Sequence, residues 1–359
     1  MKKIFSFAFL FLITFGFAQI PTNYYISAVG TGYTLKTQLY NIINGHSDRG
    51  YAGLYITYAN SDKDSFYENN GTLLDMYTEN PTGPECEFTF GVGQDDGTLG
   101  IEECQRYNRE HLIPQAVFSG QTPMYSDAHF VVPADKYING QRGDLPFGKV
   151  NTASNTYTNG TKKGQNLNSG YSAGYSGVVF EPIDEFKGDI ARCLLYFGTR
   201  YEIIVAGYSY PMFNGTSSQV FTPTFLNILL TWNQLDPVSQ REIVRNNAIY
   251  ARQNNRNPFI DDNTFVNRIW GLPLTTDSFE YTPNVAIFPN PTQNHAVTVQ
   301  SNYTIDTAQL FTIEGQKVQE INNPITNNNT FQLENIATGF YFLKVSSGQQ
   351  SITKKIIVN

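Results

Sequence analysis

The chain has 359 residues, of which 40% are apolar and 15% charged, so it is long enough for two domains and can bury a hydrophobic core. Its formal net charge of −7 counts against a protein that binds nucleic acid only through a broad basic surface. A nucleic-acid enzyme would need its basic side chains gathered locally, and the candidates are Arg142, Lys149, Lys162 and Lys163.

The first 18 residues have the pattern of a secretory signal peptide. Lys2 and Lys3 precede a nearly unbroken apolar run at 4–17, and Ala18 lies at a plausible cleavage position. The run is too short for a comfortable bilayer span. We therefore expect a mature chain without a membrane span, located outside the cell or on its surface.

The next segment predicts one helix followed by less regular chain. Residues 33–46 predict the helix, 52–80 predict mixed structure, and 81–103 are rich in Gly, Pro and acids and predict a long loop. An exported chain can keep disulfides, and a Cys86–Cys104 bond would close a loop directly before the strand described next. Cys193 lies on an apolar stripe with helical spacing and is predicted to be a buried free thiol.

The segment YNREHLIP at 107–114 holds the most informative residues. It predicts a strand that ends early, and Pro133-Ala134-Asp135 predicts the start of a helix that runs to Asn139. Glu110 and Asn139 offer the oxygen ligands that a hard divalent cation prefers, and His111 can accept a proton near neutral pH. Because neighbours on a regular strand face opposite sides, Glu110 and His111 can meet at one phosphate only if the strand ends or bulges there.

Two arginines and a second histidine complete the candidate site. Arg142, close to Asn139, is predicted to bind phosphate, whereas Arg109 is predicted either to bind phosphate or to support the strand. His129 is predicted to orient a catalytic group through its ring N–H, with direct metal ligation as the alternative.

After these residues, the sequence predicts an irregular segment on the surface and then several helices. Residues 151–177 lack periodicity and are expected to lie near the substrate groove. Helices are predicted at 184–200, at 221–233 and from Asp236-Pro237 onward. Acids favour helix starts, so we assign no second metal to the group formed by Glu181, Asp184 and Glu185.

These segments resemble the bacterial endonuclease I family of secreted, non-specific nucleases, which carry a His-metal (ββα-metal) finger. Three further stretches match in order, and the resemblance covers roughly 25–275. They are FEPIDEFKGDIAR at 180–192, DPVSQREIVRNNAIYARQ at 236–253 and NRNPFID at 255–261.

The resemblance implies a role for each residue of the motif. Glu110 and Asn139 would bind one divalent cation, Mg²⁺, with Mn²⁺ and Ca²⁺ as alternatives, and His111 would be the general base. The products would carry 5′-phosphates. Asp144 and Tyr125 depart from the family, in which we expect Asn at the first position and in some members Glu at the second.

The composition changes near residue 281. The proline-rich range 281–294 predicts a linker, and the alternating runs after it predict a small β-sandwich at 295–359. This tail, with ATGFYFLKVSSGQQSITKKIIVN, resembles the C-terminal sorting domain of Bacteroidetes proteins exported by type IX secretion. A carbohydrate- or cell-wall-binding module is the alternative for this range.

We therefore expect an α+β chain with a helix-rich catalytic domain at 19–280 that contains the finger. The expected function is a secreted, metal-dependent, non-specific endonuclease acting on DNA, with RNA left open as a substrate. The chain is expected to be a monomer and to meet the type IX secretion machinery. The alternative is an extracellular binding or adhesive protein on a catalytically degenerate nuclease scaffold. A metalloprotease is disfavoured because HExxH is absent.

Overall fold

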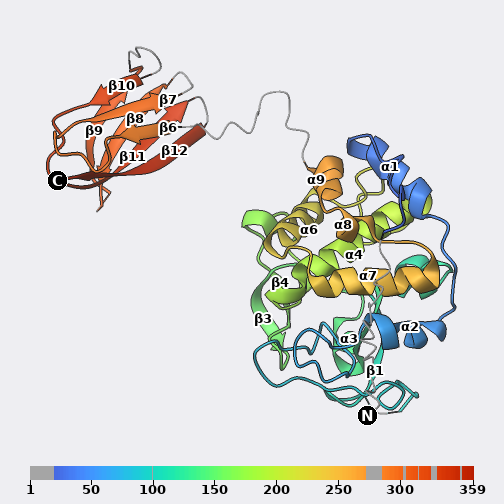
Figure 1. Cartoon of the computed structure of the whole chain (residues 1–359). Helices are drawn as coiled ribbons and strands as arrows, with labels where there is room; N and C mark the ends of the chain where they lie inside the picture. The colour runs from blue at the N-terminus through green and yellow to red at the C-terminus, as the bar shows by residue number, and fades with distance from the viewer. Residues whose placement is uncertain are drawn as a thin grey trace, which may run out of the picture. The chain divides into compact units, whose positions relative to one another are not determined.

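The structure is a computed structural model that describes residues 20–98, 100–271, 285–301, 305–313, 315–324, 330–347 and 350–359. The chain divides into two compact units, Met1–Pro273 and Leu274–Asn359, which Figure 1 shows. The predicted signal peptide at 1–18 lies outside the described residues. Among the helices that are described, none has both the length and the apolar character needed to cross a bilayer.

The first unit mixes helices with short strands. Its helices are α1 (Gly32–Ile43), α2 (Gly53–Ser61), α3 (Lys136–Arg142), α4 (Lys187–Arg200), α5 (Glu202–Val205), α6 (Pro223–Leu235), α7 (Gln240–Gln253), α8 (Pro258–Asp261) and α9 (Thr264–Trp270). Its strands are β1 (Tyr107–His111), β2 (Val131–Asp135), β3 (Val150–Thr156), β4 (Lys162–Asn166) and β5 (Val178–Glu181). The helices predicted at 33–46, 184–200 and 221–233 are confirmed as α1, α4 and α6.

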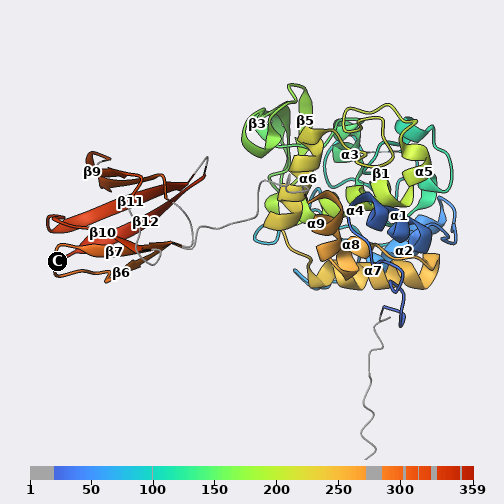
Figure 2. The ribbon, with the colours of Figure 1, turned by 90° about the horizontal axis from the view of Figure 1, so that it is seen from above.

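Helix α4 is the centre of this unit. All 14 of its residues are buried, and α1, α6 and α8 pack against it (Figure 2). Its apolar residues Ile190, Leu194 and Phe197 belong to the main hydrophobic core. Cys193 lies on the same helix as a buried free thiol, as predicted.

Buried ion pairs join α4 to α7. Arg192 of α4 donates from Nε and Nη2 to the two carboxylate oxygens of Glu242, at 2.6 and 2.7 Å. Arg241 of α7 forms the reciprocal pair with Asp189 of α4. Loss of one partner from a buried pair costs about 3–5 kcal/mol because the remaining charge has no counter-ion. The two pairs therefore fix how these helices pack.

Helix α7 begins later than the Asp236-Pro237 start that the sequence predicts. The hydroxyl of Ser239 accepts from the amide of Glu242, and the Glu242 side chain accepts from the amide of Ser239, which is a capping box. Asp236 instead accepts a 2.7 Å hydrogen bond from the amide of Gly188 in α4. The predicted cap thus serves another helix.

Strands β1 and β2 form an antiparallel pair that leads into α3. Glu110 lies opposite Val132 and His111 opposite Val131, and β1 ends at His111, as convergence of these side chains requires. The helix start predicted at Pro133-Ala134-Asp135 is confirmed, because the Asp135 side chain caps α3 by accepting from the amide of Ile138.

The prediction of an irregular excursion at 151–177 is wrong for most of its first half. Strands β3 and β4 pair there, and β4 pairs with β5. Six of the seven β3 residues are exposed, so the strand lacks the apolar alternation that would reveal it. The two strands approach so closely at Gly164 that a Cβ there would lie 2.1 Å from the carbonyl oxygen of Thr152, so only glycine fits at this position.

The second unit contains two antiparallel sheets around one core, ordered β10-β7-β6 and β12-β11-β8-β9. Val299, Leu310 and Leu343 are among its buried residues. Strand β6 falls inside the predicted linker 281–294, which is therefore wrong for 285–288. The strands are β6 (Val285–Phe288), β7 (Val297–Ser301), β8 (Thr307–Thr312), β9 (Lys317–Asn322), β10 (Thr330–Leu333), β11 (Gly339–Ser347) and β12 (Gln350–Val358).

Candidate active site

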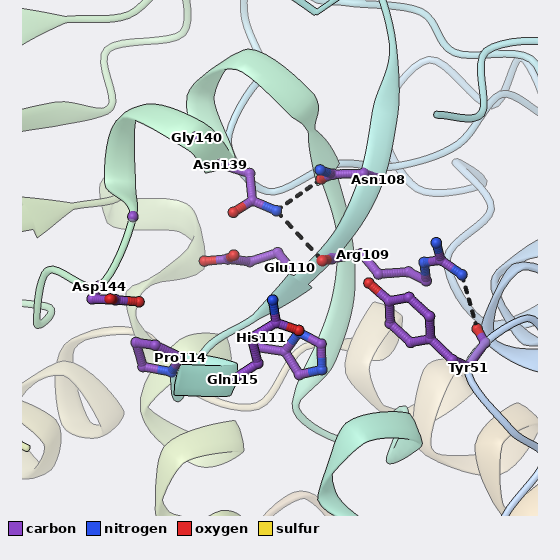
Figure 3. Close-up of a pocket in the computed structure, with 11 residues that line it drawn as sticks. Tyr51, Asn108, Arg109, Glu110, His111, Pro114, Gln115, Asn139, Gly140 and Asp144 are labelled. Atoms are coloured by element: carbon purple, nitrogen blue, oxygen red, sulfur yellow. Dashed lines mark hydrogen bonds between the residues drawn. The ribbon is translucent and has the colours of Figure 1, made fainter. Parts of the chain in front are cut away.

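A pocket of about 270 Å³ in the first unit brings together Glu110, His111 and Asn139 (Figure 3). Because a liquid water occupies about 30 Å³, this volume suits a phosphate group and a hydrated cation rather than a whole nucleotide. The other residues that line it are Tyr51, Asn108, Arg109, Pro114, Gln115, Gly140, Gly143 and Asp144.

Glu110 presents one carboxylate oxygen to the pocket. The residue is 2% exposed, and its Oε1 accepts from the Tyr77 hydroxyl and from Nη1 of Arg142, both at 2.7 Å. Its Oε2 has no hydrogen-bond donor within the described part of the chain. Burial raises the pKa of Glu110, and Arg142 opposes that shift. The result is a fixed carboxylate with one oxygen available as a ligand.

The amide of Asn139 is oriented by its neighbour on β1. Its Nδ2 donates to Oδ1 of Asn108 at 2.7 Å and to the backbone carbonyl of Arg109 at 3.4 Å. Its Oδ1 is thereby turned toward the pocket, on the same side of β1 as the Glu110 carboxylate in Figure 3. Two oxygens suited to a divalent cation thus lie in one pocket.

The imidazole of His111 is held in its neutral form. Its Nε2 lies 3.2 Å from the carbonyl oxygen of Tyr125, and a carbonyl only accepts, so Nε2 carries the proton and Nδ1 has the lone pair. The ring is 5% exposed and stacks on Tyr125, with centroids 5.4 Å apart and planes at 15°. Burial lowers the pKa of His111 to about 4, so the ring is neutral at physiological pH.

Arg109 is among the residues that line the pocket, and its side chain extends from β1 toward Tyr51, on the other side of the strand from the Glu110 carboxylate (Figure 3). Its guanidinium carbon lies 3.5 Å from the ring centroid of Tyr51 and 4.3 Å from that of Tyr55. Nη1 donates to the Tyr51 carbonyl at 3.1 Å, whereas Nε is buried and has no hydrogen-bond partner among the described residues. The clamp fixes the guanidinium while leaving donors for an anion.

The sequence predicts that Arg142 binds phosphate, but its position in the structure does not fit that role. It is 1% exposed and does not line the pocket. Its five N–H groups all have acceptors: Glu110, the carbonyls of His111, Leu112 and Leu145, and the Tyr210 hydroxyl. No donor remains for phosphate, so Arg142 positions Glu110 and the chain after β1.

His129 lies away from the pocket. It is 1% exposed, its Nε2 is 3.0 Å from the carbonyl of Asn255, and its ring lies 4.7 Å from that of Tyr196. Neither of these contacts involves a residue that lines the pocket. The structure therefore gives no support to His129 as a metal ligand and places it in the core.

The local cluster of cations expected from the sequence is only partly present. Arg142 is buried, and Lys149 is paired with Glu181 at 2.7 Å. Lys163 donates to the carbonyl of Gln141 at 2.8 Å and so lies beside the helix that carries Asn139. Asp144 adds an exposed carboxylate at the edge of the pocket.

The loop before β1 is fastened to the site. The predicted Cys86–Cys104 disulfide is present and spans 18 residues. The amide of Cys104 donates to Asp135, the cap of α3, at 2.7 Å. Tyr77, which binds Glu110, lies just before this loop, and neither Tyr77 nor Asn108 was identified from the sequence. Asn108 had a usable signal, because residues two apart on a strand share a face with Glu110.

Two family models match the chain. Residues 31–264 match Endonuclease I, and residues 286–359 match a secretion system C-terminal sorting domain. Both resemblances noted in the sequence are thereby confirmed.

Among curated proteins, an extracellular ribonuclease of Bacillus amyloliquefaciens is 33% identical over 256 residues, which cover 69% of this chain and 78% of that protein. An extracellular ribonuclease of Bacillus subtilis is 33% identical over 254 residues, with the same coverage. Endonuclease-1 of Buchnera aphidicola is 25% identical over 135 residues, 38% of this chain and 44% of that protein. With the family model matching most of the first unit, this chain belongs to the Endonuclease I family and is a nuclease.

Proposed function

We propose that the chain is an exported, divalent-cation-dependent endonuclease that hydrolyses phosphodiester bonds in both DNA and RNA. One observation carries the proposal: Oε2 of Glu110, Oδ1 of Asn139 and Nδ1 of His111 are all unpartnered within the described residues and belong to side chains that line one pocket. The strands β1 and β2 with α3 correspond to the His-metal finger in this proposal.

Glu110 and Asn139 would hold the cation. One carboxylate and one amide oxygen, with waters completing the shell, fit Mg²⁺, which keeps several waters when it binds to proteins. Once bound, the cation supplies positive charge to the scissile phosphate and to the departing 3′ oxygen. Tyr77 and Arg142 hold the carboxylate, and Asn108 holds the amide, so neither ligand must reorient.

His111 acts as the general base. Its Nδ1 takes a proton from a water molecule while Nε2–H stays bonded to the Tyr125 carbonyl. The water oxygen attacks phosphorus, the bond from phosphorus to the 3′ oxygen breaks, and the departing oxygen takes a proton from a solvent water, so that the products are a 5′-phosphate and a 3′-hydroxyl. The low pKa of His111 keeps the ring in the accepting form.

Arg109 binds a phosphate oxygen through the donors that Tyr51 and Tyr55 leave free. A guanidinium held between aromatic rings loses little entropy when it meets an anion. Its half-buried position also strengthens the attraction relative to a solvent-exposed arginine. This assignment replaces Arg142 with Arg109 as the phosphate-binding residue.

The pocket has room for a backbone phosphate rather than a whole nucleotide, which favours cleavage with little sequence preference. The relatives named ribonucleases support RNA as a substrate beside DNA. The sorting domain at 286–359 supports export by type IX secretion and action outside the cell or at its surface.

Cleavage of supercoiled plasmid and of single-stranded RNA by the mature chain tests this proposal. We expect activity with Mg²⁺ or Mn²⁺, loss with chelator, and at least a ~100-fold rate reduction in His111→Ala on both substrates. His295→Ala, which changes an exposed histidine of the second unit, should keep full activity. A rate within a few-fold of wild type in His111→Ala would refute the assignment of the base.

A further inference from the structure

Three carboxylates outside the active-site pocket form a second cluster. Asp64, Glu68 and Glu79 each place an oxygen so that the three atoms lie within 4.8 Å of one another, and none of the three residues lines the pocket. The chain brings them together through isolated bridges from Lys63 to Leu73 and from Leu73 to Phe88. The three acids thus come from one stretch of the chain, residues 64–79, which folds back on itself.

Two of these carboxylates are buried and incompletely bonded. Asp64 is 0% exposed and Glu79 is 1% exposed, and their oxygens Oδ2 and Oε1 have no hydrogen-bond partner in the described part of the chain. An ionised carboxylate that is buried without a partner costs several kcal/mol. A proton or a bound cation at these oxygens would offset that cost.

The Asp64 side chain is already oriented for a ligand. Its Oδ1 accepts from the amides of Phe66 at 3.3 Å and Tyr67 at 3.2 Å, which leaves Oδ2 pointing away from the turn. Glu68 is exposed, so the cluster is reachable from solvent. Glu85 stands within hydrogen-bonding reach of Glu79 and adds a fourth acid.

No lysine or arginine among the described residues forms an ion pair with any of these four acids. The acidic group at the start of α4 is different, because Lys187 bonds to both Glu181 and Asp184. Within the described residues, the cluster of Asp64, Glu68 and Glu79 therefore has no cationic partner, whereas the acids at the start of α4 do.

We propose that Asp64, Glu68 and Glu79 bind a Ca²⁺ ion that is separate from the catalytic cation. Ca²⁺ takes six to eight oxygen ligands at about 2.3–2.6 Å, so ligand atoms on one ion lie up to about 5 Å apart, as these do. Mg²⁺ demands a stricter octahedron and keeps more of its water, and it fits a cluster of several flexible acids less well. The ion would tie the Asp64 turn to Glu79, two residues after Tyr77, whose hydroxyl holds Glu110.

Thermal unfolding of the mature chain, purified in chelator and titrated with Ca²⁺, tests this proposal. A ligand at ~100 times its dissociation constant should raise the melting temperature of a domain of this size by roughly 5–10 °C. Asn139→Ala, which removes a proposed catalytic ligand, should keep the Ca²⁺-dependent shift. Glu87→Gln, an exposed acid in the same segment, should keep it as well.

Glu79→Gln should abolish the shift. In chelator this variant should melt at or above the wild-type temperature, because it removes a buried acid without changing side-chain size. Glu68→Gln alters an exposed side chain, so it should fold normally and need at least ~10 times more Ca²⁺ for half of the shift. A wild-type chain without a Ca²⁺-dependent shift, a shift retained in Glu79→Gln and Glu68→Gln, or a shift lost in Asn139→Ala would each overturn the proposal.

Discussion

Replacing Asn108 by Ala should make the nuclease need more Mg²⁺ without disabling its chemistry. Asn108 touches neither substrate nor base in the proposed mechanism. Its Oδ1 accepts the 2.7 Å hydrogen bond that turns the Asn139 amide so that its oxygen faces the pocket. Without that acceptor, the Asn139 amide can rotate and present its NH₂ group, which repels a cation.

The size of the effect follows from the bonds that remain. A neutral hydrogen bond contributes about 0.5–1.5 kcal/mol, and the 3.4 Å contact from Asn139 Nδ2 to the Arg109 carbonyl survives the substitution. Supporting residues behind metal ligands typically change metal affinity by about 10–100-fold. Because one of two orienting bonds persists, we expect a shift near the lower limit, about tenfold in the Mg²⁺ concentration for half-maximal rate.

The assay is plasmid cleavage over a Mg²⁺ titration at saturating DNA. Asn108→Ala should recover most of the wild-type kcat at high Mg²⁺, whereas His111→Ala should not recover at any concentration. Asn108→Asp keeps the acceptor and is the matched control, with Mg²⁺ dependence at or below the wild-type level. An unchanged titration curve in Asn108→Ala would show that the backbone bond alone orients Asn139, and the reasoning would fail.

Three further predictions concern stability. Arg142→Met should lower the free energy of unfolding by about 3–5 kcal/mol in urea titrations, since Glu110 loses its buried cationic partner; a phosphate-binding arginine would instead change KM with little loss of stability. Burial lowers the pKa of His129 to about 4, below its unfolded value, so its contribution to stability is lost as pH falls through 6.5 toward 4. Wild type should lose about 2 kcal/mol more than His129→Gln between pH 7 and pH 5, and equal losses would contradict the assignment. Replacing Cys86 and Cys104 by Ser should cost about 3 kcal/mol, because an 18-residue loop is no longer closed in the unfolded chain; calorimetry that finds no loss would contradict this.

Local chemistry made part of this site predictable from the sequence. Glu110, His111 and Asn139 carry functional groups that few purely structural positions need, and Pro114 indicated the early strand end that lets neighbours share a pocket. The roles of these residues remain predictions, although their convergence on one pocket is now seen.

Long-range packing set the limits of prediction. Whether an arginine faces solvent or core depends on distant partners, and Arg142 is buried by contacts that reach from Glu110 to Tyr210. Tyr77 lies 33 residues before the carboxylate that it binds, with no periodic pattern to connect them. Strand β3 has few buried side chains, so its pairing could not appear as alternation.

The reciprocal pairs between α4 and α7 also explain why two distant stretches remain recognisable together. Arg192 and Asp189 belong to the stretch at 180–192, and Glu242 and Arg241 belong to the stretch at 236–253. A substitution of one partner on either helix leaves the other charge buried without a counter-ion. A substitution at these positions is therefore tolerated only when the partner on the other helix changes as well. Relatives would therefore inherit the two stretches as one unit, even where the surface that meets nucleic acid diverges.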